Sequence, residues 1–397
     1  MISGKKIIIG ITASISAYKV YTLIRLLVKK GAEVRVVITP AAKDFVSTTL
    51  LSTFSNHKVY CDFVENEMWK NHVQLGRWAD LFIIAPASYN TIAKMANGIC
   101  DNFLMATYLS ATCKVVVLPA MDDEMWKHPS TQKNINTLTS FNNDIIEPRI
   151  GLLASGIVGI GRLPEPEEIV KTIEEKYFRD SVLAGKTILI TAGPTQEPID
   201  PVRMITNRSS GKMGYAIAET LYLLGANVIL VSGPVNITCN YAGISIIKVG
   251  TAAEMFDACI KEAQTFDIGI FCAAVADYTI SSPNKYKIKK EDEVLQLELI
   301  KTKDIIGYIG KNKLVHQKII GFALETNNEL PNALLKLKNK HADLVVLNSL
   351  NASNECFNND DNKVSFIDAN GQITNFETLP KLAIAKNIAN YIITNWQ

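Results

Sequence analysis

The sequence predicts an α/β protein with two doubly wound, mainly parallel sheets in tandem. In the first half, short β-branched runs such as KKIIIGI, EVRVVIT and KVVVLPAM alternate with amphipathic helical segments. Uninterrupted apolar strands separated by helices are typical of parallel strands that are covered on both faces. The alternation starts again at residues 183–195, and a chain of 397 residues exceeds the usual size of a single core. We therefore expect two domains, residues 1–180 and 181–397.

The first half supplies its elements in order. The strands are expected at 5–11, 33–39, 80–87 and 114–121, and the helices at 16–31, 92–98 and 103–111. Lys29, Lys30 and Gly31 end the first helix in the usual way, with cations near its carbonyl groups and a glycine just beyond. The glycine-rich stretch 151–166 is predicted to be a loop, and the charged segment 165–182 a helix that joins the halves.

The second half repeats the alternation without being a true repeat, because its loops differ in length and chemistry. Its strands and helices are expected within 183–195, 215–233, 253–277, 318–326 and 334–350. Ligands of such sheets bind outside the carboxyl ends of the strands, near the point where the strand order reverses. The candidate sites lie at those ends.

Composition excludes several classes of function. The net charge of +2 gives no electrostatic reason to bind a polyanion. Lysines or polar residues interrupt each apolar run within about 18 positions, so no membrane span is expected. The seven cysteines are scattered without a C-x-x-C pair, which argues against zinc and against a disulfide framework. A protein of the reducing cytoplasm fits these observations.

Polar side chains follow the first strand of the predicted sheet. Thr12 and Ser14 come after Gly10 in GITASISAYK, where hydroxyls and backbone N–H groups at a helix start suit a phosphate. Ordinary capping of the helix explains the same residues equally well. The expected strand at 80–87 is preceded by His72 and followed by Ser88 and Asn90.

These motifs together resemble known families. GITASISAYK, NHVQLG around His72, PASYNT and PAMDDEMW resemble the homo-oligomeric flavin-containing cysteine decarboxylases, in the right order and spacing. TAGPTQEPIDPVRMITNRSSGKMGYAIA, AAVADY, KIKK and GFALETN resemble phosphopantothenate cysteine ligase. In this order, and over almost the whole chain, they are similar to the bifunctional decarboxylase and ligase family of coenzyme A biosynthesis.

The resemblance implies two Rossmann-like domains, of which the first is flavodoxin-like and binds FMN. The residues expected around FMN are Gly10, Thr12, Ser14, Thr39 and Ser88. His72 would act in oxidising the substrate thiol to a thioaldehyde, which provides the electron sink for loss of CO2. Asn90 would hold the substrate carboxylate, and Met121 would line the same pocket. Reduced flavin and an acid would then convert the enethiol to the thiol.

The glycine-rich stretch resembles the clamp of this family, which folds over the substrate and usually reads ACGD. Here residues 154–157 read ASGI, so Ser155 replaces a cysteine that would donate the last proton. An alkanol is a far weaker acid than a thiol. Asp122 stands where asparagine is usual, and a carboxylate there repels an anionic substrate unless it is protonated or paired. We therefore expect an impaired reductive half-reaction. Arg162 is either a contact for a phosphate or carboxylate or a solvated loop arginine.

The ligase resemblance implies that CTP activates a carboxylate as an acyl-cytidylate. Asn207 would act on that intermediate, and Arg203 would help convert it with cysteine. Lys287 would neutralise charge on the departing pyrophosphate, although an exposed mixed-charge segment also explains KYKIKKEDE. The residues expected around CTP are Ala273, Asp277, Phe322, Lys336 and Lys340. Asp277 would hold Mg²⁺ or nucleotide hydroxyls, or would cap a helix.

Two more stretches stand out. NRSSGKMG precedes a helix and suits an anion, but it is not a P-loop. ECFNNDDNKVSFID resembles the F-x-x-D-x-N stretch of the ligases, with Asp360 or Asp361 in the acidic place, and no role is assigned to it.

The resemblance also implies partners. These are the small molecules 4′-phosphopantothenate, L-cysteine and CTP, without nucleic acid or membrane, in an assembly of trimeric flavin domains and dimeric ligase domains. The alternative is an active ligase whose flavin domain is only oxidatively active, or is a non-catalytic scaffold, because Ser155 replaces the clamp cysteine. An NAD-linked reductase is disfavoured, since G-x-G-x-x-G and the acidic residue about 20 positions later are missing.

Overall fold

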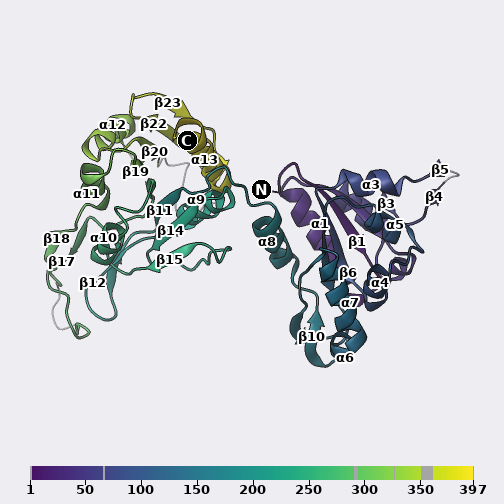
Figure 1. Cartoon of the computed structure of the whole chain (residues 1–397). Helices are drawn as coiled ribbons and strands as arrows, with labels where there is room; N and C mark the ends of the chain where they lie inside the picture. The colour runs from purple at the N-terminus through teal and green to yellow at the C-terminus, as the bar shows by residue number, and fades with distance from the viewer. Residues whose placement is uncertain (1, 66–67, 290–293, 326, 350–360, 397) are drawn as a thin grey trace. The chain divides into compact units, whose positions relative to one another are not determined.

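Two compact units make up the chain, residues 1–178 and 179–397. Figure 1 shows the computed structural model, which describes residues 2–65, 68–289, 294–325, 327–349 and 361–396. Each unit is a mainly parallel sheet with helices on both faces. The predicted fold class, two tandem Rossmann-like α/β domains, is confirmed. The division between the units falls beside Asp180.

The first unit contains a six-stranded sheet. Its elements, with η for 3-10 helices, are β1 (Lys6–Ile11), η1 (Ile15–Lys19), α1 (Val20–Lys29), β2 (Glu33–Ile38), η2 (Pro40–Asp44), α2 (Thr48–Ser55), β3 (Val59–Tyr60), β4 (Val64–Glu65), β5 (Met68–Trp69), α3 (His72–Trp78), β6 (Leu81–Ala87), α4 (Tyr89–Ala96), α5 (Phe103–Leu109), β7 (Lys114–Pro119), α6 (Asp123–Lys127), α7 (Pro129–Ser140), β8 (Asp144–Ile145), β9 (Arg149–Leu152), β10 (Val158–Arg162) and α8 (Pro166–Tyr177). The strand order β3-β2-β1-β6-β7-β8 is parallel throughout and reverses between β1 and β6.

Alternate residues of β1 enter two separate cores. Ile7 and Ile9 pack with α1 and α8 on one face, whereas Ile8 packs with α3, α4, α5 and α7 on the other. A strand points successive side chains to opposite faces. A run of isoleucines such as KIIIGI is therefore buried on both sides, as expected of a doubly wound sheet.

Two segments of the first unit differ from the prediction. The charged segment after residue 165 does not merely join the halves, because Ile169, Val170 and Ile173 of α8 are buried in the core under α1. The glycine-rich stretch is an antiparallel hairpin of β9 and β10 rather than an irregular loop. Periodicity missed the hairpin because its apolar side chains are largely exposed.

The second unit contains an eight-stranded sheet. Its elements are β11 (Thr187–Ala192), β12 (Gln196–Pro198), β13 (Met204–Thr206), α9 (Lys212–Leu223), β14 (Asn227–Ser232), β15 (Ser245–Lys248), α10 (Ala252–Lys261), β16 (Ile268–Phe271), β17 (Tyr278–Ile280), β18 (Leu299–Lys301), α11 (Ile305–Asn312), β19 (Lys318–Glu325), α12 (Glu329–Asn339), β20 (Leu344–Ser349), β21 (Asp361–Asn362), β22 (Val364–Asp368), β23 (Ile373–Asn375), β24 (Leu379–Pro380) and α13 (Lys381–Trp396). The order is β15-β14-β11-β16-β19-β20-β22-β23, and only β22 and β23 are antiparallel to their neighbours.

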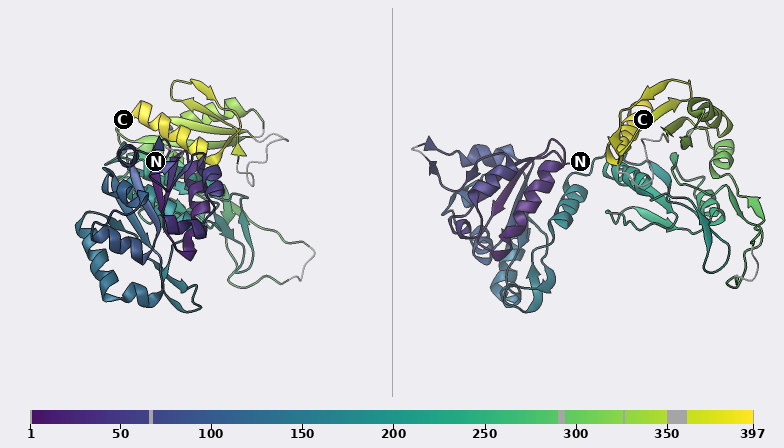
Figure 2. Two further views of the ribbon diagram at one scale, coloured as in Figure 1. Left: turned by 90° about the vertical axis from the view of Figure 1, so that its right-hand side faces the viewer. Right: turned by 180° about the vertical axis from the view of Figure 1, so that it is seen from behind.

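The second sheet is also covered on both faces. Helices α10, α11 and α12 share one core with the sheet, and α9 packs against α13. The strand order reverses between β11 and β16, which places a binding crevice at their carboxyl ends. Strands β17 and β18 pair as an antiparallel hairpin, and the described residues that follow β17 (281–289) and precede β18 (294–298) extend away from this sheet, as Figure 2 shows.

Candidate functional sites

Thr12 links the two strands at the switch point of the first sheet. Its hydroxyl donates to the carbonyl of Pro86 at 2.7 Å and accepts from the backbone N–H of Ser88 at 2.8 Å. Thr12 is fully buried. Ser88 in turn caps α4, and Ser14 caps η1. Capping, left open by the sequence, is therefore realised at Ser14, and Thr12 fixes the spacing of the two loops that follow β1 and β6.

A cavity of about 570 Å³ opens at the carboxyl edge of this sheet. It is lined by Ser14, Ile15, Ser16, Tyr18, Lys19, Met121, Asp122, Leu152, Leu153, Ala154, Ser155, Gly161 and Arg162. Four of the residues expected from sequence, Ser14, Met121, Ser155 and Arg162, therefore meet at one cavity.

The β9–β10 hairpin is fixed against α6 by close backbone contacts. The N–H of Met121 donates to the carbonyl of Gly161 at 3.2 Å, and a Cβ at Gly161 would stand 1.9 Å from the carbonyl oxygen of Met121. The N–H of Ile160 donates to Asp123 Oδ1 at 2.9 Å. Only glycine fits at position 161. The hairpin tip is thus held over the cavity.

The tip brings Ser155 to Asp122. The Ser155 hydroxyl donates to Asp122 Oδ1 at 3.0 Å, and the same oxygen accepts from the N–H of Asp123 at 3.1 Å. The Asp122 carboxylate is therefore paired with hydrogen-bond donors. The Ser155 proton points to Asp122.

Cations also face this cavity. Lys19 is 6% exposed, and its ammonium contacts the carbonyl of Leu163 and Glu165 Oε1, each at 2.8 Å. Arg162 donates to the same Glu165 oxygen at 2.8 Å. Both interactions lower the pKa of Glu165, with Lys19 as the larger cause. Arg162 is thus a paired side chain at the cavity wall.

The other expected flavin-site residues do not line this cavity. His72 begins α3, where its ring packs edge-on against Phe63, Trp69 and Phe103 at centroid distances of 5.9, 5.8 and 6.3 Å. The His72 Nδ1 atom is buried and has no hydrogen-bond partner. Thr12 and Ser88, described above, are also absent from its lining. So are Gly10, which is packed beside Leu104 and Phe82, the buried Thr39 and the exposed Asn90.

The switch point of the second sheet is built from backbone and two threonines. The segment after β11 pairs with the segment after β16 through a bridge between Pro194 and Ala274. The Thr191 and Thr195 hydroxyls accept from the N–H groups of Ala273 and Ala276 at 3.2 and 3.0 Å. These hydrogen bonds fix the conformation of residues 273–276, which immediately precede Asp277.

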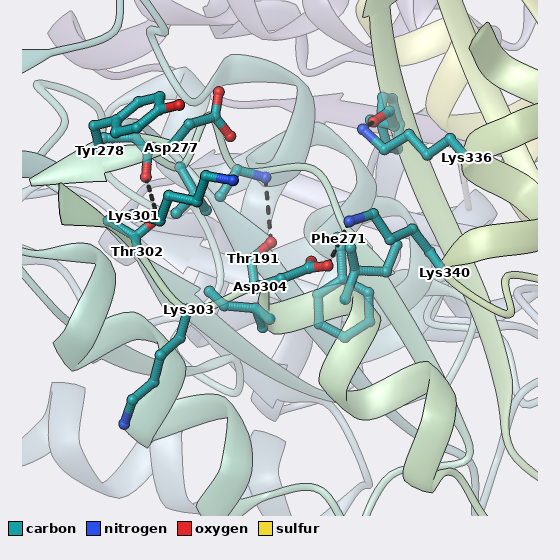
Figure 3. Close-up of a pocket in the computed structure, with 16 residues that line it drawn as sticks. Thr191, Phe271, Asp277, Tyr278, Lys301, Thr302, Lys303, Asp304, Lys336 and Lys340 are labelled. Carbon is teal, nitrogen blue, oxygen red and sulfur yellow. Dashed lines mark hydrogen bonds and ion pairs between the residues drawn. The ribbon is translucent and has the colours of Figure 1, made fainter.

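A cavity of about 510 Å³ adjoins this turn (Figure 3). All five residues expected around CTP line it: Ala273, Asp277, Phe322, Lys336 and Lys340. The lining contains four lysines, at 301, 303, 336 and 340, and two aspartates, at 277 and 304, so it has an excess of positive charge. The side chain of Lys303 extends away from the aspartates (Figure 3) and lies over the ring of Phe256. Figure 3 shows Lys336 and Lys340 across the cavity from Asp277. Such a lining suits a polyphosphate.

Lys336 is one of two partly buried lysines of this cavity, with Lys340. Its ammonium donates to the carbonyl of Phe322 at 2.6 Å. Burial lowers the pKa of Lys336, with an opposing contribution from Glu325. Lys340, in contrast, forms an ion pair with Asp304. A partly desolvated ammonium interacts strongly with an incoming anion, because little water competes for it.

Asp277 is exposed at the mouth of the cavity. Strand β17 follows it rather than a helix, so the capping alternative for this residue is wrong. Within the described residues, no group of three or more histidines, cysteines, aspartates or glutamates is placed to hold a metal ion. Mg²⁺ commonly binds to one or two carboxylates together with substrate phosphates, and Asp277 fits that mode.

A second cavity, of about 370 Å³, shares Ala273, Val275, Asp277, Phe322 and Lys336 with the first. Beyond these it is lined by the start of α9 and by the end of β20, with Asn207, Ser209, Ser210, Gly211, Lys212, Met213, Gly214, Cys272, Ala274, Ala323, Leu324, Asn348, Asn362 and Lys381. The Asn207 amide donates to the carbonyl of Ala274 at 3.0 Å. Asn207 therefore lines the smaller cavity and is bonded to Ala274, which lies between the shared residues Ala273 and Val275.

Arg203 and Lys287 lie outside both cavities, but Asp200 connects their segments. The buried Asp200 carboxylate accepts from Val202 N–H, Arg203 N–H and the Arg203 guanidinium at 2.7, 2.8 and 2.8 Å. It also accepts from Ile288 N–H at 3.1 Å. Burial raises the pKa of Asp200, but these donors and the Arg203 charge outweigh it, so the pKa is lowered. Lys287, next to Ile288, is exposed.

Sequence reasoning missed Lys19, Asp200, Asp304 and Asn362. Lys19 could have been noticed because it immediately precedes the largely apolar helix VYTLIRLLVK, where a cation is unexpected. Asp200 and Asp304 each accept hydrogen bonds from backbone N–H groups two or three positions later, which sequence shows as ordinary turn or cap residues. Their contacts with distant segments, of Asp200 with Ile288 and of Asp304 with Lys340, appear only in the structure. Two residues named from sequence, Asp360 and the last lysine of KIKK at 290, lie outside the described residues.

Family models match both units. The Flavoprotein model matches residues 1–178, and the model "DNA/pantothenate metabolism flavoprotein C-terminal domain" matches residues 183–395. The chain is 40% identical over 398 residues to the "Coenzyme A biosynthesis bifunctional protein CoaBC" of Haemophilus influenzae, covering 100% of this chain and 99% of the relative. It is 44% identical over 355 residues to a "Cysteine/Cysteine sulfinic acid decarboxylase" from an unknown prokaryotic organism, covering 88% and 99%.

A solved structure also matches the second half. The crystal structure of the C-terminal domain of a coenzyme A biosynthesis bifunctional protein CoaBC is 39% identical and covers 54% of this chain and 97% of its own, with a TM-score of 0.46. None of the helices in the described part of this chain combines the length and the hydropathy needed to cross a bilayer.

Proposed function

Because the chain belongs to the family of bifunctional coenzyme A biosynthesis proteins, we propose that its two units catalyse successive steps. The second unit joins 4′-phosphopantothenate to L-cysteine at the expense of CTP. The first unit, with FMN, decarboxylates the 4′-phosphopantothenoylcysteine so formed. The single observation that carries the ligase assignment is the shared wall of the two cavities at Asp277, Phe322 and Lys336.

The ligase proposal assigns one substrate to each cavity. The larger cavity, with its excess of lysines, takes CTP. Asp277 would hold a Mg²⁺ ion, which would help to neutralise the phosphate charge. The smaller cavity takes the acid, whose carboxylate reaches the α-phosphate across Lys336. Asn207, in the smaller cavity, orients the acyl-cytidylate, and Arg203 aids its reaction with cysteine. Lys287 reaches the pyrophosphate from the segment that Asp200 anchors.

The residues of the first unit fit a phosphate-bearing flavin. Ser14 and Ser16 provide hydroxyls, the start of η1 provides N–H groups, and the buried Lys19 provides a cation at one cavity. Thr12, Thr39 and Ser88 shape the loops around it. When bound, FMN accepts the electrons released on thiol oxidation and returns them after CO2 has left. Met121 and Arg162 contact the substrate in the same cavity.

His72 and Asn90 complete this site from a second copy of the chain. The orphaned Nδ1 atom of His72 lies among aromatic rings, apart from the cavity that holds Ser14 and Ser155. A base must lie within hydrogen-bond reach of the proton that it takes. In a trimer of flavin units, His72 of one copy lies at the cavity of the next copy, within hydrogen-bond distance of the substrate. The ligase units form dimers, so the whole assembly combines threefold and twofold symmetry.

A second candidate substrate comes from the relative that decarboxylates cysteine or cysteine sulfinic acid. The phosphorylated amide would bring a phosphate to Arg162 at the cavity wall, whereas a small amino acid of this kind carries no such group. The larger substrate is therefore favoured.

The test is an assay of one purified sample with each substrate in turn. Pyrophosphate release from CTP should require both 4′-phosphopantothenate and cysteine. CO2 release should occur with 4′-phosphopantothenoylcysteine and should be at least about tenfold slower with free cysteine or cysteine sulfinic acid. A protein that binds no flavin and releases no pyrophosphate contradicts the proposal, and a preference for the free amino acids contradicts the substrate assigned to the first unit.

A further inference from the structure

Among the described residues of the second unit, one buried side-chain oxygen has no hydrogen-bond partner. Asn362 is 4% exposed, and its Oδ1 atom accepts no hydrogen bond. Nearly all buried polar atoms in proteins are satisfied, because leaving one unpaired is costly. An unpaired acceptor at a cavity wall is explained by a donor that arrives with the ligand.

Backbone pairing places Asn362 at the smaller cavity. It ends β21, where it pairs with Leu379 of β24, two positions before Lys381 begins α13. Val364, two positions later, pairs with Asn348 at the carboxyl end of β20. Asn362 therefore lies at the edge of the sheet where ligands bind, and it lines the cavity of about 370 Å³ with Asn348 and Lys381.

The charges of this cavity select the kind of donor. Lys212, Lys336 and Lys381 line it with a single carboxylate, that of Asp277. Such a lining attracts an anionic ligand and disfavours an ammonium group, such as that of cysteine. The donor that pairs with Asn362 Oδ1 is therefore an uncharged O–H or N–H group carried by an anion.

We propose that Asn362 is a specificity-determining residue for the acid substrate of the ligase, and this rests on the function proposed above. 4′-Phosphopantothenate carries anionic groups at both ends, with a hydroxyl and an amide N–H between them. The lysines hold the ends, and Asn362 Oδ1 accepts a hydrogen bond from the middle. An acid that lacks this donor leaves the oxygen buried and unpaired, so it is discriminated against.

The experiment pairs a variant with altered substrates. Asn362→Leu removes the acceptor at similar volume, and Asn339→Leu, on the exposed end of α12, is the matched control. The substrates are 4′-phosphopantothenate, its deoxy analogue and its analogue with an ester in place of the amide. Pyrophosphate release gives kcat/KM for each. Asn362→Ala replaces the leucine variant if the latter does not fold.

The wild type and Asn339→Leu should prefer the parent acid over one of the analogues by about tenfold to hundredfold. Asn362→Leu should accept that analogue and the parent equally within about threefold, with KM for CTP unchanged because Asn362 does not line the CTP cavity. If Asn362→Leu discriminates against both analogues as strongly as the wild type does, Asn362 has no such role. A wild type that turns over no acid at all overturns the proposed ligase function as well.

Discussion

The Ser155 hydroxyl donates its hydrogen bond to Asp122 Oδ1, at 3.0 Å. The two residues come from segments 33 positions apart and meet because the β9–β10 hairpin docks on α6. A hydroxyl in this arrangement is a weak acid whose proton already has an acceptor. The pair therefore explains in atomic terms why the last protonation of the decarboxylation should be slow.

Restoring a thiol should speed that step. In Ser155→Cys we expect 4′-phosphopantetheine to form from 4′-phosphopantothenoylcysteine about tenfold faster or more, because a thiol is acidic enough to donate near neutral pH. Mass spectrometry of single turnovers separates this product from the oxidised intermediate. Ser155→Ala should slow the product by less than about threefold. If the alanine variant forms no product, the hydroxyl is itself the acid and the explanation is wrong.

Docking of the hairpin should depend on the absence of a side chain at position 161. Gly161→Ala would place a Cβ 1.9 Å from the Met121 carbonyl oxygen, so the tip should leave the cavity. We expect decarboxylation to fall about hundredfold, since misplacing a reacting group by about 1 Å has effects of this size. Ligase activity, in the other unit, should be unchanged.

The matched control for that variant is Gly156→Ala at the hairpin tip. Its φ of +85° is strained for alanine, but a Cβ there meets nothing within 4 Å. Gly156→Ala should therefore lower the free energy of unfolding by only the backbone strain, about 1–2 kcal/mol, and should leave the hairpin docked. Equal loss of decarboxylation in both variants would show that the contact with Met121 is unimportant.

Binding of CTP should weaken at alkaline pH. Burial lowers the pKa of Lys336, so this ammonium loses its charge at a pH below the ordinary value for lysine. KM for CTP should rise as pH increases through that lowered pKa, with kcat less affected. In Lys336→Arg the charge persists, because a guanidinium has a pKa above about 12, and the rise in KM should disappear. An unchanged pH profile in that variant would assign the effect to another group.

Asp200 should stabilise the second unit at neutral pH. Its pKa is lowered in the folded state, so its contribution is present above the ordinary aspartate pKa of about 3.9 and is lost as pH falls through the lower, folded value. Asp200→Asn should therefore lower the melting temperature most near neutral pH and not at all in strong acid. Ligase kcat/KM should fall about tenfold, because the segment of Lys287 loses its anchor at Ile288.

The control for Asp200 is Asp257→Asn, on the exposed side of α10. It should leave both the melting temperature and ligase activity unchanged at every pH. A difference between wild type and Asp200→Asn that persists in strong acid would mean that packing, and not the charge of Asp200, is responsible.

Much of the fold could be predicted because the spacing of apolar residues along the sequence indicates which faces of each strand and helix are buried. The isoleucines of β1 are buried on both faces, and that burial places Gly10, Thr12 and Ser88 at one switch point. The residues assigned to CTP were named from motifs. Lys336 of α12 and Lys340, the C-cap residue of that helix, reach the same cavity because they are four positions apart.

What sequence could not predict depends on contacts between distant segments. The β9–β10 register rests on a backbone approach at Gly161 that no periodicity encodes. The role of Asn362 depends on an atom that lacks a partner, which only the packed structure reveals. His72 was assigned to the flavin site, yet within one chain it lies among aromatic rings away from the cavity of Ser155.

We propose that one chain carries out both reactions in order. The most direct measurement supplies a single purified sample with CTP, 4′-phosphopantothenate and L-cysteine and follows all products by mass spectrometry. Our account predicts pyrophosphate and 4′-phosphopantothenoylcysteine first, followed by slow decarboxylation to 4′-phosphopantetheine by a protein that carries a flavin. A colourless protein that leaves CTP intact and forms no amide would contradict it.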